Sequence, residues 1–160
     1  MKKLIVALVL SCGASVYAAH SVPFKAAIHQ EGIPIGACGP ACVTVSLTGT
    51  GHASHAGVVE QAGTVNLDFA TLTQAGISTS TAADGSTFVV AFGGPLVPGP
   101  GGSVTFHGGW SVVSGTGRFQ GASGGGTFEG LTGSMRFGTD HARTDPPRIY
   151  VVAGDDIKPF

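Results

Sequence analysis

The chain has 160 residues, of which 42% are hydrophobic, 11% are charged and 27 are glycine, and its formal net charge is −1. This hydrophobic content argues against an intrinsically disordered chain, which combines low hydrophobicity with high net charge. Its eight lysines and arginines do not form the basic clusters that bind phosphate groups, so we expect no nucleic-acid partner.

The first 18 residues have the pattern of an export signal peptide. Lys2 and Lys3 precede the apolar residues 4–10, and small residues end at Ala18. The apolar run is shorter than the roughly 20 residues of a membrane-spanning helix, so we expect no such segment. The pattern predicts a secreted or periplasmic protein. The alternative is a lipid anchor on Cys12, because residues 9–12 loosely resemble a bacterial lipobox.

The mature chain is expected to begin with an N-terminal region over residues 19–41. Residues 24–29 alternate as one strand, and residues 33–40 contain prolines, glycines and a cysteine, which predict a loop. Cys38 and Cys42 remain as a pair in an oxidising compartment, so they predict a disulfide that closes a short loop. No metal-ligating residues adjoin them, and we expect no metal site or cofactor.

No helical periodicity follows the signal peptide, whereas alternation with a period of two recurs. Asp84-Gly85 predicts a hairpin turn, and residues 93–102, with their prolines, predict a loop. The predicted strands are residues 42–55, 58–69, 72–81, 86–92, 103–113, 134–137 and 149–152 and a pair around residues 115–130. The fold class expected is all-β: one antiparallel closed barrel of about eight strands over residues 42–152, with a tail at 153–160.

Within residues 103–113, side chains of two kinds alternate. Val104, Phe106, Trp110 and Val112 fall on one face of the strand, and we expect that face to be buried.

The stretch "GTGRFQGASGGGTFEG", residues 115–130, has the glycine content of a phosphate-binding loop. A nucleotide site of that kind requires a helix after the glycines, and no helix is predicted here. The stretch is better interpreted as a turn followed by strongly curved strands, with Phe119 and Phe128 as apolar anchors.

Two segments resemble a known family. "GTGHASHAG", residues 49–57, and "SGTGRFQGASG", residues 114–124, are similar to the "GTG...THLG" and "GGTGRFxGATGSG" motifs of secreted bacterial proteins with a barrel like that of allene oxide cyclase and plant dirigent proteins. The resemblance spans roughly residues 43–130 and implies a β-barrel. It implies no activity, since no allene oxide cyclase active site aligns onto this chain. Ala56 stands where the group has leucine, and residues 140–160 match nothing in it.

His55 is the first candidate site residue. If the alternation of Val43, Val45 and Leu47 continues, Gly49, Gly51, Ala53 and His55 lie on the same face. Small residues there would leave space at one end of the barrel, with His55 at its rim. The alternative interpretation of His55 is a structural histidine at the end of a strand.

Glu60, Arg118 and Trp110 are the other ligand-binding candidates. A carboxylate beside the lumen could act as a base, and an arginine could hold an anion, although both types are commonly solvated. Trp110 is expected in the core lining. His52, His55 and His107 do not converge in an extended strand, so we expect no zinc site.

Two functions of different classes follow from these patterns. The favoured one is a non-enzymatic barrel that binds a small apolar or amphipathic ligand or serves as an interaction module, with a homo-oligomer left open. The alternative is a cofactor-free isomerase or cyclase, in which His55 or Glu60 assists proton movement within the lumen.

Overall fold

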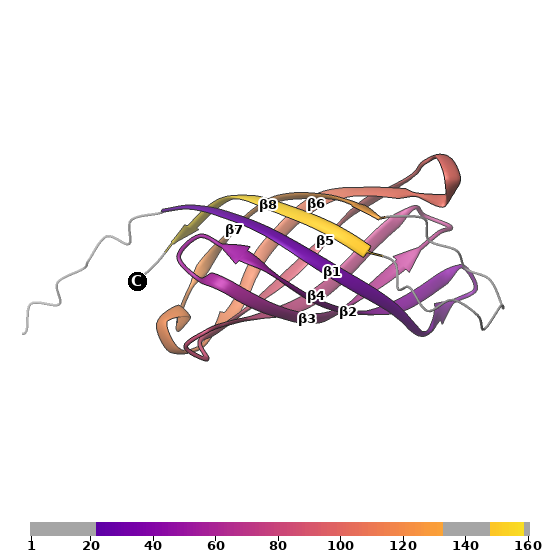
Figure 1. Cartoon of the computed structure of the whole chain (residues 1–160). Coiled ribbons are helices and arrows are strands. Elements are labelled where there is room, and N and C mark those ends of the chain that lie inside the picture. The colour runs from indigo at the N-terminus through magenta and orange to yellow at the C-terminus, as the bar shows by residue number, and fades with distance from the viewer. Residues whose placement is uncertain (1–21, 133–147, 159–160) are drawn as a thin grey trace, which may run out of the picture.

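The computed structural model describes residues 22–132 and 148–158, which form eight strands and two 3₁₀ turns (Figure 1). The predicted signal peptide at residues 1–18, Cys12 and the predicted strand at residues 134–137 lie outside the described residues. Within them, no helix is long and apolar enough to cross a membrane. The strands are β1 (Val22–Gly39), β2 (Cys42–Ala53), β3 (Gly57–Asp68), β4 (Thr73–Ala82), β5 (Thr87–Pro98), β6 (Val104–Gly115), β7 (Ser123–Thr132) and β8 (Arg148–Lys158).

From β1 to β7, each strand pairs antiparallel with the next strand in the chain. The predicted all-β class and antiparallel sheet are therefore confirmed. β8 pairs with β7 along one side and with β1 along the other, which gives the sheet the strand order of a closed barrel. Figure 1 shows β8 lying between these two strands.

Alternation along the strands separates a buried inner face from an exposed outer face. In β6, Val104, Phe106 and Trp110 are buried and Val112 is half-buried, as the sequence predicts. The core consists of Phe24, Ala26, Ile28, Val45, Leu47, Ala53, Ala56, Val59, Val65, Leu67, Phe88, Leu96, Val104, Phe106, Trp110 and Phe128.

The strand β8 runs to Lys158, so the tail predicted at residues 153–160 is wrong over most of its length. The strands β1 and β5 are also longer than the sequence predicts, because prolines are accommodated in both. β1 continues to Gly39 through Pro34, beyond the last described pair with β8 at Glu31 and next to an irregularity in the ladder with β2. β5 continues to Pro98, and its ladder with β6 is interrupted where Pro95 lies. A proline lacks only its N–H donor, so it fits a strand wherever that donor has no ladder partner. The loops predicted at residues 33–40 and 93–102 are therefore wrong over most of their length.

A disulfide joins Cys38 and Cys42 across the turn between β1 and β2, with their Cα atoms 4.9 Å apart. Cys38 is the residue before the last one of β1, and Cys42 is the first residue of β2. The bond therefore fixes the end of this long hairpin, as the sequence predicts.

Candidate functional site

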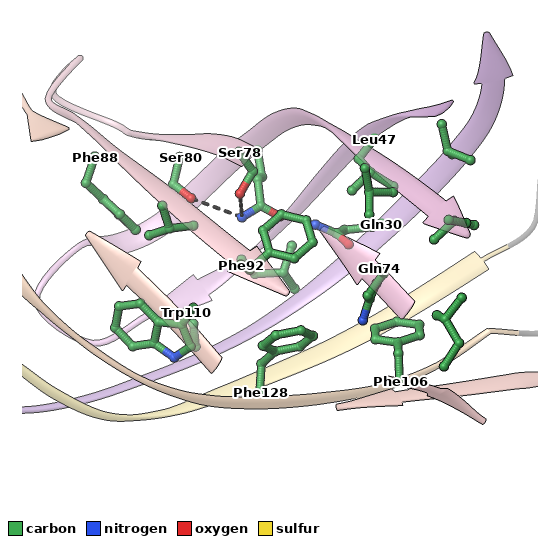
Figure 2. A pocket seen from close by; sticks show the side chains of 18 of the residues that line it. Gln30, Leu47, Gln74, Ser78, Ser80, Phe88, Phe92, Phe106, Trp110 and Phe128 are labelled. Atoms are coloured by element: carbon green, nitrogen blue, oxygen red, sulfur yellow. Dashed lines mark hydrogen bonds between the residues drawn. The ribbon is translucent and has the colours of Figure 1, made fainter. Parts of the chain in front are cut away.

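A cavity of about 90 Å³ lies among the inward-facing side chains of the sheet (Figure 2). Strands β1 to β7 all contribute to its lining. All but five of the lining residues are apolar; the full set is Phe24, Ala26, Ile28, Gln30, Val45, Leu47, Gln61, Val65, Leu67, Gln74, Ser78, Ser80, Phe88, Val90, Phe92, Leu96, Phe106, Trp110 and Phe128. We call this cavity the lumen.

Aromatic rings form much of the lumen wall. Phe24 lies 5.4 Å from Trp110 between ring centroids, and Phe92 meets Phe128 edge-on at 5.7 Å. The indole N–H of Trp110 donates a hydrogen bond of 3.1 Å to the carbonyl oxygen of Thr127. With its polar atom satisfied by the backbone, the indole presents an apolar face to the lumen. Trp110 is thus the one sequence candidate that lines the lumen.

A row of polar side chains crosses this apolar wall. Gln30 on β1 and Gln61 on β3 both lie opposite Gly49 of β2 in the strand register. Because Gly49 has no side chain, the Gln30 amide reaches across β2 and donates a hydrogen bond to the Gln61 amide oxygen. The Gln61 amide nitrogen in turn donates to the hydroxyls of Ser78 and Ser80, at 3.2 and 3.3 Å. These hydrogen bonds, two of them drawn in Figure 2, give the buried amide nitrogens of both glutamines partners within the barrel.

A third glutamine, Gln74 on β4, is not part of this row. Its side chain is 7% exposed and lines the lumen, and its amide nitrogen is buried without a hydrogen-bond partner. Figure 2 shows Gln74 in the same lumen as Gln30, Phe106 and Phe128. The lumen lining therefore carries one buried amide nitrogen that has no hydrogen-bond partner among the described residues.

His55 does not lie at the rim of the lumen. β2 ends at Ala53, and His55 occupies the following turn with a positive φ of 63°. Its side chain is exposed, and its Nε2 lies 3.1 Å from the carbonyl oxygen of Pro23. The alternation that would have placed His55 inside stops two residues earlier, so the structural interpretation of this histidine is the one that the geometry favours.

The inward glycines before His55 do not leave the open space that the sequence suggests. A Cβ atom added to Gly51 would meet the carbonyl oxygen of Ala27, and one added to Gly49 would meet that of His29. These glycines let the backbones of β1 and β2 approach closely and bend, which is how glycine permits curvature in a small barrel. The space at Gly49 is used by the Gln30 and Gln61 side chains.

Glu60 faces outward, because its neighbours Val59 and Gln61 occupy the inward positions of β3. It lies in a surface groove with His29, Glu31 and Thr81, on the opposite side of the sheet from the lumen. A carboxylate there is solvated and cannot act on a molecule held inside. The structure thus separates Glu60 and His55 from the lumen and from each other.

Arg118 links two turns at one end of the barrel. Its Nη2 donates a hydrogen bond of 2.9 Å to the carbonyl oxygen of Ala56, and its Nη1 lies 3.5 Å from the carboxylate of Asp84. Its guanidinium also lies 5.0 Å from the ring centroid of Phe119. With these partners the arginine stabilises the end of the barrel, and it does not line the lumen.

The carboxylate of Asp84 accepts a hydrogen bond from the backbone N–H of Ser86, 3.0 Å away. This bond, with a smaller contribution from the charge of Arg118, lowers the pKa of Asp84 below its ordinary value of 3.8. Ser86 also accepts a hydrogen bond from the backbone N–H of Arg118. The contacts among Asp84, Ser86 and Arg118 therefore join the "GTGRF" turn to the Asp84-Gly85 turn.

Among the described residues, no group of three or more histidine, cysteine, aspartate or glutamate side chains could hold a metal ion. The side chains of His52 and His107 are exposed on the outer face of β2 and β6. No lining residue of the lumen has an ionisable side chain. The lumen can therefore hold an apolar guest away from water and offer it the amide nitrogen of Gln74 as a donor. Its lining supplies no ionisable acid or base.

The polar lumen residues Gln30, Gln61, Gln74, Ser78 and Ser80 are absent from the sequence-based candidates. The signal that identifies them is positional: each occupies an inward position of its strand, in phase with buried residues such as Ile28, Val59 and Ala82. A polar side chain at such a position must find a partner inside the barrel.

Comparison of the chain with family models, curated proteins and solved structures gives no match.

Proposed function

We propose that the protein is a secreted or periplasmic closed barrel that binds a compact, mainly apolar molecule in its lumen without transforming it. The observation that carries this proposal is the lumen itself: a cavity of about 90 Å³ with an apolar lining and no ionisable side chain. Small barrels either fill their interior with side chains or keep room for one small ligand. The resemblance of residues 49–57 and 114–124 to the allene oxide cyclase and dirigent group supports the barrel as the functional unit.

The size of the lumen limits the guest. Pockets for drug-sized ligands have volumes of about 300–1,000 Å³, whereas an apolar cavity of about 150 Å³ takes up benzene. At about 90 Å³ the lumen suits a guest no larger than a single small ring, taken up with some side-chain rearrangement, or the end of a longer molecule. We therefore propose a compact guest in place of the broader amphipathic class.

Catalysis in the lumen finds no support in the described residues. A cofactor-free isomerase or cyclase needs a group that moves a proton within hydrogen-bond reach of the substrate. The two residues suggested for that role, His55 and Glu60, lie on a turn and on the outer face. Binding is therefore the function that we favour.

A titration with a compact hydrocarbon, methylenecyclopentane, tests the proposal. The chain has one tryptophan, so the single indole N–H signal of Trp110 in a ¹H–¹⁵N NMR spectrum reports on the lumen wall without further assignment. We expect a saturable shift of that signal. Ala26→Leu, which adds bulk to the lumen lining, is expected to weaken binding at least about tenfold.

Ala27→Leu is the matched control, because Ala27 adjoins Ala26 on β1 and is exposed on the outer face. It should leave the titration unchanged. A linear, non-saturating response in the wild type, or equal binding by both variants, would contradict the proposal.

A further inference from the structure

The amide nitrogen of Gln74 is buried in the lumen lining without a hydrogen-bond partner. All three lumen glutamines are buried, at 5%, 9% and 7% exposure for Gln30, Gln61 and Gln74. The first two have donors engaged in the row that ends on Ser78 and Ser80. Only the Gln74 amide nitrogen, among the described buried side-chain atoms, has no partner.

A buried amide donor without a partner costs folding free energy that an apolar side chain of similar size would not cost. Nothing in the fold of β4 requires a polar residue at position 74, since the ladder with β3 and β5 is made by backbone atoms. Leucine or methionine would fill the same place. The unpaired Gln74 donor thus lowers the stability of the protein while the lumen is empty. It can form a hydrogen bond only with an acceptor on a bound ligand.

The chemistry of that partner follows from the rest of the lining. It must accept a hydrogen bond from an N–H group. It must also be uncharged, because no lining side chain could compensate a charge in this apolar environment. Its remaining surface must be apolar to match the rings of Phe92, Phe106 and Phe128 and the leucines and valines beside them.

Building on the proposed function, we propose that Gln74 is a specificity residue: it donates a hydrogen bond to the single acceptor oxygen of a compact neutral ligand, such as an aldehyde, ketone or ester carbonyl. The lumen discriminates such a molecule from the hydrocarbon of the same shape and from a carboxylate. Gln30, Gln61, Ser78 and Ser80 differ from Gln74 in that each already has a hydrogen-bond partner within the lumen.

Three probes of similar size test the assignment: cyclopentanone, methylenecyclopentane, in which a CH₂ group replaces the ketone oxygen, and butyrate. We expect the wild type to bind cyclopentanone about tenfold more tightly than methylenecyclopentane, the effect of about one net hydrogen bond. Butyrate should not bind. The side-chain NH₂ signals of Gln74 should shift with cyclopentanone and stay in place with methylenecyclopentane.

Gln74→Leu is expected to abolish the preference for cyclopentanone while leaving methylenecyclopentane binding intact, and to raise the thermal midpoint of the free protein by removing the unpaired donor. Gln120→Leu, at an exposed glutamine in the turn before β7, is the control and should keep the preference. The wild-type comparison of the three probes does not depend on how well either variant folds.

The outcomes separate the two proposals. Equal binding of cyclopentanone and methylenecyclopentane would overturn the role of Gln74 and leave lumen binding standing. Preference for butyrate, or a lower thermal midpoint in Gln74→Leu, would also overturn that role. Binding of none of the three probes would overturn both proposals.

Discussion

Arg118 donates a hydrogen bond of 2.9 Å to the carbonyl oxygen of Ala56, across 62 positions of sequence. The two residues belong to the glycine-containing segments 114–124 and 49–57, and this bond brings the segments together at one end of the barrel. Arg118 and Ala56 therefore have a structural role: their hydrogen bond connects the turn after β2 to the turn after β6.

Replacing Arg118 should destabilise this end of the barrel. Arg118→Met removes the hydrogen bond to Ala56 and the ion pair with Asp84, and we expect a loss of about 1 kcal/mol in the free energy of unfolding, since the side chain is 45% exposed. Denaturant unfolding of the wild type and the variant measures this difference in the free energy of unfolding. Gln120→Met, at an exposed position of the same turn, should stay within about 0.5 kcal/mol of the wild type. Ligand binding in the lumen should persist in both variants; loss of binding in Arg118→Met alone would contradict a purely structural role.

Asp84 should contribute a pH-dependent part of the stability. Its pKa is lowered in the folded protein, so the charged carboxylate stabilises the fold above the ordinary value of 3.8, and this contribution disappears as the pH falls through the lowered pKa. Asp84→Asn keeps the shape of the side chain and removes the charge. We expect the wild type to be the more stable protein at pH 7 and the difference to shrink at pH values well below 3.8.

Thermal unfolding of both proteins across this pH range measures the effect. A stability difference that stays constant with pH would show that the shape of the side chain, and not its charge, accounts for the effect of the substitution.

The strand glycines should tolerate alanine only where no backbone atom lies close to the added Cβ atom. A Cβ atom at Gly51 would overlap the carbonyl oxygen of Ala27, whereas one at Gly36 has no atom within 4 Å. We expect Gly51→Ala to lower the free energy of unfolding by about 1–3 kcal/mol, and Gly36→Ala to change it by less than about 0.5 kcal/mol. Denaturant midpoints compare the two. Equal effects would contradict the close approach of β1 and β2.

Much of the fold could be predicted from the sequence, because alternation and turn residues act locally. The alternation in β6 and the Asp84-Gly85 turn both predict what the structure contains. The prolines of β1 and β5 predict loops where the structure has strands. A proline ends a strand only when its missing N–H donor would have had a ladder partner. That condition depends on neighbouring strands, which the sequence of one segment does not reveal.

The candidate site was harder to predict, because it depends on where strands end and on register. The alternation that predicts an inward His55 stops at Ala53. Glu60 lies on the outer face because its neighbours Val59 and Gln61 occupy the inward positions. The Gln30–Gln61 hydrogen bond needs both residues to lie opposite Gly49, which follows only from the pairing of three strands.

The most direct measurement on the lumen is a crystal structure of the protein under xenon pressure, since xenon enters dry apolar cavities and is visible by its scattering. A xenon atom among Phe92, Phe128 and Gln74 is the result that we predict. Xenon bound only on the outer surface, with side chains closing the interior, would contradict a barrel that holds a ligand.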